Sequence, residues 1–587
     1  MPAAGAGAAS PQPSGGTTQP PRTVITGRGR GRTQSVSLED WEAWWRFNRD
    51  AFLVRRKYLP TRQQNSRDTD VFLGRSVPGT PPRALPPDWT ALRHQIVPAL
   101  RSALEDSSPT VRAAACTALG KVGFDEDVPA LGARLADTSA FVREAATLGL
   151  GLIGQEAGRP ALLAVLKADH KGQQLRGGRP PEIQMRAVAA LALGLLGRDP
   201  DGEVTECLEL LSTHPTASPD MALLATVALG LVEGDRRAVS RVAWHLKDLA
   251  TRQRGVNDWI QAQAVTALQR IHERNRFSAD DRTLSGLARL ASEARIAHVR
   301  RSAVVALGAL VHTPEHEAVA AQELADLRDS GKDSHTRNLA AVALGRIGGE
   351  AAYRALVAGL EESGQSVHRV YCALGLALLL RGLQDRAAPE APRDLTPGFI
   401  HLRRAFDESR DLSSRSGLAL ALGIARDRDS GARLLQELKR SSEPTQRGHL
   451  ALALGMVGHE PAVPELTALL LETKYPPFLK EQIATGLGIL GRKNLVALLE
   501  RLERSRSAQD LDAVLRAVAL VGDQSAVKPL AALAVDPRAQ IQTRAAACRA
   551  LGVLGDPHPI PVLAALRADH NYLAASAAVN AILFRDL

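Results

Sequence analysis

Ala118-Leu119-Gly120-Lys121-Val122-Gly123 is the first copy of a motif that recurs along most of this 587-residue chain. With Gly120 taken as a marker, equivalent positions follow at a mean spacing of about 36 residues. Gly occupies all but three of the markers, which are residues 120, 151, 194, 230, 269, 308, 345, 375, 423, 455, 488, 519, 552 and 583. A period of this length is typical of helical hairpins stacked into a solenoid.

Each repeat reads as two helices joined by a turn. In the first repeat an amphipathic segment, Val97–Leu104, is followed by the turn 106–109 and then by a second segment rich in Ala. The small residues allow the second helix to approach its neighbours closely, and the Gly that follows the marker by three residues suits a left-handed helix end. We therefore predict an all-α fold, a right-handed α-solenoid of about fourteen helical hairpins over residues 90–587.

Composition agrees with closely packed helices. Aromatic residues make up 4% of the chain, and it contains 4 Cys and 4 Met. Four cysteines in this length exclude a disulfide scaffold. The longest apolar runs, such as Val370–Leu380, are too short to span a bilayer. We therefore predict no membrane span.

Charge is concentrated at the N-terminus. The chain has 73 basic and 63 acidic side chains, and residues 1–86 hold 13 of the basic and 6 of the acidic ones. The remaining body is nearly neutral, which does not favour a continuous nucleic-acid groove. The basic tract Gly27–Arg32 leaves weak nucleic-acid binding through the N-terminal arm as an alternative.

Three segments precede the repeats. We predict a disordered, basic Gly/Pro/Ser tail over 1–36, an aromatic helical N-terminal cap over 37–75 and a Pro-rich connector over 76–89. No hydrophobic stretch of the secretory kind follows Met1. This predicts a cytoplasmic protein, with an exported form as the alternative if the start codon is misassigned.

Tryptophans are concentrated in the predicted cap. Residues 37–40 have the pattern of a capping box, and the following helix, expected to run to about Lys57, carries Trp41, Trp44 and Trp45. One interpretation is a cap that covers an end or flank of the array, because terminal repeats need covering. The other is an aromatic docking site for a partner.

An arginine lies eight residues before the marker in eight repeats. Here it would start the second helix and form a ladder along the solenoid. We call these residues the arginine ladder: Arg112, Arg143, Arg186, Arg300, Arg337, Arg415, Arg447 and Arg544. The ladder can be structural, through bonds to carboxylates and carbonyls, with Asp106 and Asp137 as partners, or it can bind anions. Arg300, Arg337, Arg415 and Arg447 are the central candidates for partner binding.

On these motifs the chain resembles the HEAT-repeat superfamily, particularly its short-repeat branch related to phycobilisome lyases. The segment Trp41-Glu42-Ala43-Trp44-Trp45-Arg46-Phe47-Asn48 is similar to the preface of large bacterial HEAT-repeat proteins. The resemblance implies HEAT-like hairpins that bind other proteins along their inner surface. It suggests a non-catalytic protein-binding scaffold. A lyase-like or chaperone-like factor acting on a cofactor-bearing protein is the alternative.

Catalytic motifs are weak in this sequence. A HEAT-type dinuclear-iron hydroxylase uses His-Glu pairs near the start of second helices. The three His-Glu pairs here, which begin at His272, His316 and His459, do not have that register. We predict no catalytic residue, no metal site and no cofactor. Two insertions, about 171–181 and 384–397, interrupt the period and are expected to form loops.

Overall fold

The computed structural model describes residues 40–53, 88–214, 217–252, 256–311, 313–386, 394–472, 476–490, 508–522 and 524–558, together with Leu563 and Leu566. Within these residues the fold is helical, and extended pairing is limited to a bridge between Arg198 and Glu233. The predicted all-α solenoid is confirmed. The predicted tail, connector and fourteenth marker lie outside the described residues, apart from the last two positions of the connector.

The described hairpins follow one another in chain order. Their first helices are α4 (Trp89–Ala103), α6 (Val128–Ala133), α8 (Arg159–Lys167), α11 (Glu203–Thr213), α13 (Arg236–Thr251), α15 (Asp281–Glu293), α17 (Pro314–Ser330), α19 (Gly349–Glu362), α21 (Thr396–Glu408), α23 (Gly431–Arg440), α25 (Val463–Leu471) and α29 (Val527–Val535). Their second helices are α5 (Pro109–Val122), α7 (Ala140–Leu152), α10 (Ile183–Leu196), α12 (Pro219–Leu229), α14 (Asp258–Asn275), α16 (Ala297–Leu310), α18 (Ser334–Ile347), α20 (Ser366–Arg386), α22 (Leu412–Ile424), α24 (Pro444–Val457), α26 (Pro477–Ile489), α28 (Ala508–Val521) and α30 (Ile541–Leu554).

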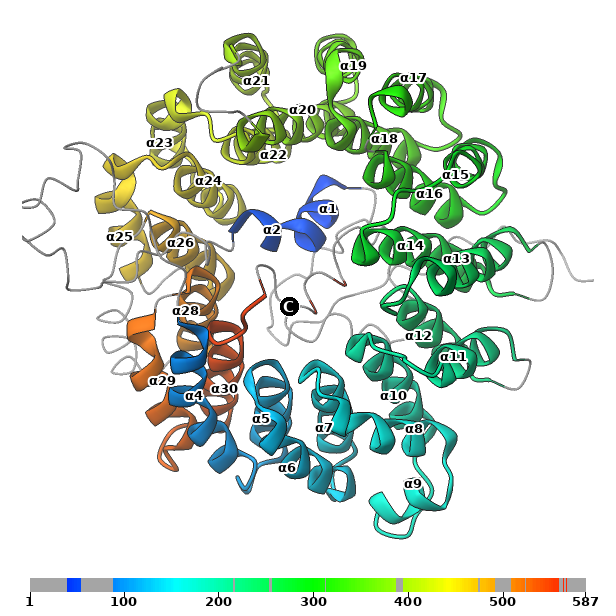
Figure 1. The fold of residues 1–587 in the computed structure, drawn as a ribbon. Coiled ribbons are helices and arrows are strands. Elements are labelled where there is room, and N and C mark those ends of the chain that lie inside the picture. Colours follow the sequence, from blue (N-terminus) through cyan, green and yellow to red (C-terminus); the bar gives the residue numbers. More distant parts are fainter. Residues whose placement is uncertain are drawn as a thin grey trace, which may run out of the picture.

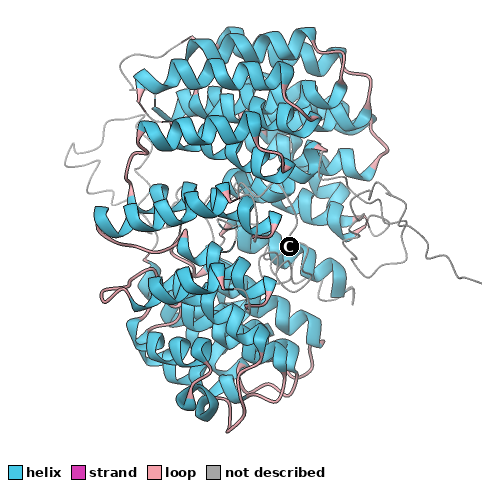
Figure 2. Cartoon of the chain, turned by 90° about the vertical axis from the view of Figure 1, so that its right-hand side faces the viewer, coloured by secondary structure: helices cyan, strands magenta, loops and turns pink. Residues whose placement is uncertain are grey.

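These helices form two concentric layers. Each second helix packs on the second helix of the next hairpin, while the first helices lie outside (Figure 1). From the side, the helices run across the thickness of the array, nearly parallel with its axis (Figure 2). The second helices therefore line the inner face, as predicted.

Close contact between second helices explains the marker glycines. A Cβ atom on Gly194 would lie 2.5 Å from the Cα of Ala228 on the next inner helix. The Gly three residues after the marker has two different roles. Gly458 ends α24 with φ 77°, in the left-handed region, as predicted, whereas Gly123 has φ −69°. Gly123 instead avoids a clash, because its Cβ would lie 2.6 Å from the carbonyl oxygen of Leu119.

The array closes into a ring. The last described hairpin packs on the first, α30 against α5 and α29 against α4 (Figure 1). A Cβ on Gly552 would lie 2.7 Å from the Cα of Ala118, so this seam repeats the contact made inside the array. The thirteen described second helices complete one turn, which requires about 28° per helix.

The N-terminal aromatic helix lies inside this ring. Helix α1 (Trp41–Asn48) is followed at Arg49 by the short helix α2 (Asp50–Leu53), and both lie on the inner face (Figure 1). The predicted helix to Lys57 is thus described only as far as Leu53, with a break. Asp40 is the N-cap residue but makes no side-chain cap hydrogen bond. The segment expected to cover an end or flank of the array covers part of its inner face instead.

The leucines before the markers form the core between hairpins. Leu119, Leu193, Leu344 and Leu454 are each at most 1% exposed. Part of the first insertion forms a short helix, α9 (His170–Leu175), rather than a loop. In the second insertion, residues 387–393 lie outside the described part of the chain.

One described helix has the length and apolar composition of a membrane span. It is α20, which carries Tyr371, Cys372 and Leu374 among its fully buried side chains. In the ring it packs between α18 and α22. It therefore has the setting of a core helix.

Candidate functional site

The arginine ladder lies at the rim where the two helices of each hairpin are joined. Arg300 Nη1 donates to the backbone oxygens of Ala294 (2.8 Å) and Arg295 (3.1 Å) in its own turn. Its Nη2 donates to Asp333 of the next hairpin at 2.7 Å. Burial raises the pKa of Asp333, but the bonds from Arg300 and Thr336 outweigh this and leave it below its usual value.

The other three central candidates share the bond to the carbonyl oxygen six residues earlier. Arg337 donates to Gly331 at 3.0 Å, Arg415 to Ser409 at 3.1 Å and Arg447 to Ser441 at 2.6 Å. These bonds satisfy backbone acceptors at the end of each interhelix turn. They confirm the structural interpretation of the ladder, and partner binding by these arginines stays a prediction.

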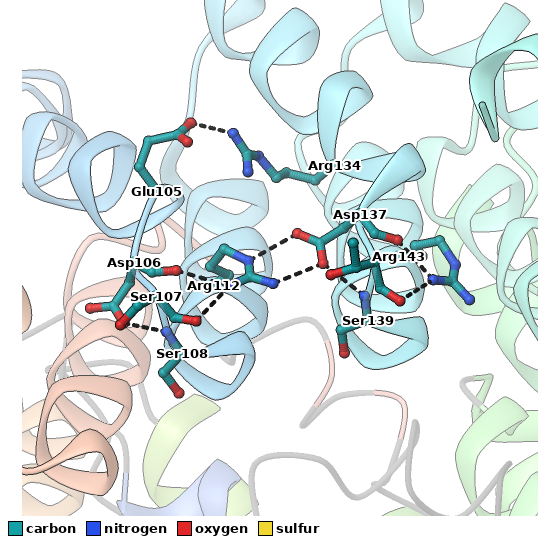
Figure 3. A network of polar contacts seen from close by, with 10 residues as sticks. Glu105, Asp106, Ser107, Ser108, Arg112, Arg134, Asp137, Ser139 and Arg143 are labelled. Atoms are coloured by element: carbon teal, nitrogen blue, oxygen red, sulfur yellow. Dashed lines mark hydrogen bonds and ion pairs between the residues drawn. The ribbon is translucent and has the colours of Figure 1, made fainter.

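The ladder also links successive hairpins. Arg112 donates to Asp137 of the next hairpin through Nε and Nη2, both at 2.9 Å (Figure 3). Arg143 in turn donates to Glu182 at 2.5 Å. At the seam, Arg544 Nη2 of the last hairpin donates to Asp106 Oδ1 of the first at 3.1 Å. This is the same kind of arginine–aspartate link that Arg112 makes to Asp137 inside the array.

The tryptophans lie on another part of the inner face, where α1 contacts α20, α22 and α24. Trp41 is 1% exposed, and its Nε1 donates to Ser413 Oγ at 3.1 Å. Its ring meets the imidazole of His449 edge-on, with 5.2 Å between centroids. A Cβ on Gly417 would lie 3.1 Å from the indole, so this glycine makes room for the ring. The Tyr371 hydroxyl donates to the backbone oxygen of Asp40 at 3.2 Å.

Trp45 and Arg49 extend the contact towards α26 and α28. Trp45 is 3% exposed and stacks on Phe52 of α2, with 6.0 Å between ring centroids. The guanidinium of Arg381 lies 5.1 Å from the centre of the Phe52 ring. Arg49 Nη2 lies 3.4 Å from Glu481 Oε1, and Glu481 also pairs with Arg516 on α28. Trp44 is buried in the same apolar core.

We call the surface beneath α1 and α2 the tryptophan seat, made of Val370, Tyr371, Ser413, Gly417, His449 and Glu481. Its electrostatic character is set by burial. Burial and the nearby Arg49 charge lower the pKa of His449 to about 4. The imidazole is therefore neutral at pH 7 and presents its ring to Trp41.

A second part of the inner face is covered from the other chain end. Leu563 and Leu566 are 1% and 2% exposed and share an apolar cluster with side chains of α7, α10, α12 and α14. Arg270 of α14 donates to the backbone oxygen of Leu566. Segments from both ends of the chain therefore contact the inner helices.

Comparison with known proteins identifies the repeats. The family model "HEAT repeats" matches residues 97–177 and 495–582, at the two sides of the seam. The chain therefore contains HEAT repeats in these two segments. The likeness to the phycobilisome-lyase branch and to bacterial members stays a prediction.

Individual relatives match only in part. Bovine deoxyhypusine hydroxylase (Bos taurus) is 33% identical over 116 residues, which are 20% of this HEAT-repeat chain and 37% of the enzyme. The chain thus spans just over a third of that enzyme's length. Among solved structures, yeast importin-β (Kap95p) has 15% identity and a TM-score of 0.40, covering 77% of this chain and 66% of that one. Human deoxyhypusine hydroxylase in complex with glycerol has 21% identity and a TM-score of 0.22, covering 57% and 97%.

The His-Glu pairs of this HEAT ring lie far apart in the chain and in different surroundings. His272 is in the last turn of α14 and its Nδ1 lies 3.2 Å from the Phe277 carbonyl oxygen. His316 is in the first turn of α17 and contacts Asp281 at 2.9 Å. His459 follows the end of α24. Within the described ranges, no group of three or more His, Cys, Asp and Glu side chains is suited to a metal ion.

One thiol has neighbours of the kind used in nucleophilic catalysis. Cys372 Sγ lies 3.5 Å from His368 Nε2, and His368 Nδ1 lies 2.8 Å from Asn338 Oδ1. The thiol is fully buried, and burial raises its pKa to about 12. It is therefore protonated at pH 7 and closed to a substrate, which favours a structural role.

Sequence reasoning missed a cavity that lies where the ladder is interrupted. Gln261 stands where the fifth hairpin would carry its ladder arginine, and its Nε2 donates to the Arg252 carbonyl oxygen. A cavity of about 1100 Å³ lies at this junction, with Arg289 and Arg295 among its lining residues. The sequence gives no specific signal for this cavity, because the ladder arginine is also missing at Ala222, Val367 and Leu511.

Proposed function

We propose that this HEAT-repeat ring is a non-catalytic protein-binding scaffold that recognises its partner on the inner face. One observation carries the proposal. The inner face already binds an aromatic amphipathic helix, because α1 is seated there through Trp41, Trp44 and Trp45. A surface that buries three indoles of a separate helix has the chemistry of a helix-binding groove. The inner-helix residues that hold these tryptophans then belong to the recognition surface.

Exposed aromatic side chains on other inner helices support the same surface. Phe141 of α7 and Phe478 of α26 are each 47% exposed. Both lie ten residues before their markers, the same register as Ser413, which contacts Trp41 from the inner face. Half-exposed aromatic side chains on an inner face present apolar surface that a protein partner can contact.

The proposal is tested with a photoreactive phenylalanine that carries benzophenone, introduced in cells into the full-length chain. Phe141 and Phe478 are the inner positions. Trp244 of α13, which is 70% exposed, and Tyr353 of α19 are matched aromatic positions on outer helices. Irradiation is expected to give discrete protein adducts from the inner positions and few from the outer ones. Adducts of equal yield from both sets would contradict inner-face recognition.

A further inference from the structure

The tryptophan seat indicates what kind of partner the ring accepts. Resting on the proposed function, we infer that the partner presents an amphipathic helix with Trp, Trp and a basic residue at positions i, i+4 and i+8. This helix takes the place of α1. The spacing is that of Trp41, Trp45 and Arg49, which fall on one helical stripe.

The first position is selective for indole. Ser413 Oγ accepts the indole N–H at 3.1 Å, a bond that a Phe or Leu anchor cannot make. Gly417 provides a flat surface, and a side chain there would meet both Val370 and the indole. The edge of His449 adds an aromatic contact. An aliphatic anchor would leave the seat partly empty and its hydroxyl without this donor.

The third position selects a cation. Glu481 is 7% exposed and lies between Arg49 at 3.4 Å and Arg516 at 3.4 Å. A buried carboxylate with cations on both sides favours a basic residue and disfavours an acidic one at the position of Arg49.

The chain's own helix fills this seat incompletely, which makes it replaceable. Trp45 Nε1 on the helix and His449 Nδ1 in the seat are buried without hydrogen-bond partners among the described residues. Each such atom costs free energy that a better-matched occupant recovers. Helix α1 is also short, and Phe52 of α2, seven residues after Trp45, stacks on its ring. A longer helix can extend this contact along α26 and α28.

The test uses the full-length chain and a fluorescein-labelled synthetic peptide of residues 38–53. In the Trp41→Ala/Trp45→Ala protein the internal occupant is weakened, so the peptide is expected to bind at least about tenfold tighter than to the wild-type protein. A peptide with Trp41→Phe is expected to bind at least about threefold more weakly, because it lacks the donor for Ser413. The inference would be overturned if the peptide bound both proteins with equal affinity, or if it bound neither.

A charge exchange guards against a variant that fails to fold. Glu481→Lys in the Trp41→Ala/Trp45→Ala background is expected to weaken the peptide, and a peptide with Arg49→Glu is expected to restore affinity. Failure of that restoration, with the helical circular dichroism intact, would overturn the basic third position. If inner-face adducts form in cells but the peptide does not bind, the proposed function stands and the helix motif fails. If the peptide binds but no inner adducts form, the motif stands for α1 alone and the proposed function fails.

Discussion

The arginine ladder and the tryptophan seat relate to the repeat in opposite ways. The ladder recurs at one register, and its arginines bond to carbonyls and carboxylates of the array, as Arg112 does with Asp137. The seat occurs once in the described chain, and residues as different as Ser413 and His449 from neighbouring hairpins meet one helix. The residues that recur at one register link neighbouring hairpins, and the residues that depart from the repeat form the proposed recognition surface.

The largest effect is expected on the ladder side of this comparison. Arg112→Ala removes the guanidinium that pairs with the buried Asp137 carboxylate and that donates to two turn carbonyls, and should lower the free energy of unfolding by about 3–5 kcal/mol. Denaturant melts measure this loss, and the affinity of the seat should not change. The control is Arg354→Ala, which removes a solvent-exposed pair with Glu350 and should change stability by less than about 0.5 kcal/mol. Loss of peptide affinity in Arg112→Ala would break the separation between ladder and seat.

The seam tests whether the ladder closes the ring in solution. Asp106→Asn weakens the link from Arg544 and should cost about 1.5–3 kcal/mol, as Asp137→Asn should at the internal junction with Arg112. Hydrogen exchange in α30 and α5 reports the seam, and exchange in α5 and α7 reports the internal junction. If Asp106→Asn leaves the exchange rate of α30 unchanged while Asp137→Asn raises that of α7, the array is open at the seam in solution.

A pH effect is expected from the seat and its neighbouring inner helices. Burial lowers the pKa of His298 and His449 to about 4 and that of His335 to about 3, below the 6.5 of an unfolded histidine. The unfolded chain therefore binds more protons between pH 6.5 and 4, so stability is full above pH 6.5 and falls as the pH falls through this window. Each histidine should contribute up to about 2 kcal/mol of loss at pH 5. Replacing His449 by Gln should flatten the pH dependence of the melting temperature, and replacing the exposed His170 by Gln should not.

The smallest effect is expected from the tail. Removing residues 1–36 should leave the melting temperature and the seating of α1 unchanged, since the composition of this segment cannot support packing. Differential scanning calorimetry of the shortened chain measures the first, and hydrogen exchange of Ala43–Asn48 the second. A drop of several degrees would show that the tail helps to hold α1.

The sequence predicts the repeated part of this molecule well, because one physical requirement recurs in each hairpin. Close contact of inner helices needs a residue such as Gly194, and the register of Arg300 follows from the turn that it bonds. Ring closure could not be predicted in this way. It depends on small rotations between hairpins that add up around the array, and no single residue encodes their sum.

Only the helix that occupies the tryptophan seat could be predicted from the sequence. The aromatic stripe that carries Trp41 was visible in the chain, but its partners Ser413 and His449 lie some 370 to 410 positions away. They carry no motif of their own, since a serine and a histidine on Ala-rich helices resemble ordinary core substitutions. Their meaning appears only when the solenoid bends round to face the N-terminal helix.

Hydrogen–deuterium exchange of α1 in the wild-type protein tests the central claim most directly, that the ring seats an aromatic helix on its inner face. The account predicts that amides from Ala43 to Asn48 exchange at least about 100-fold more slowly than in an unstructured peptide. In the Trp41→Ala protein the same amides should approach the unstructured rate while the inner helices stay protected. Exchange of these amides at the unstructured rate in the wild-type protein would contradict the account.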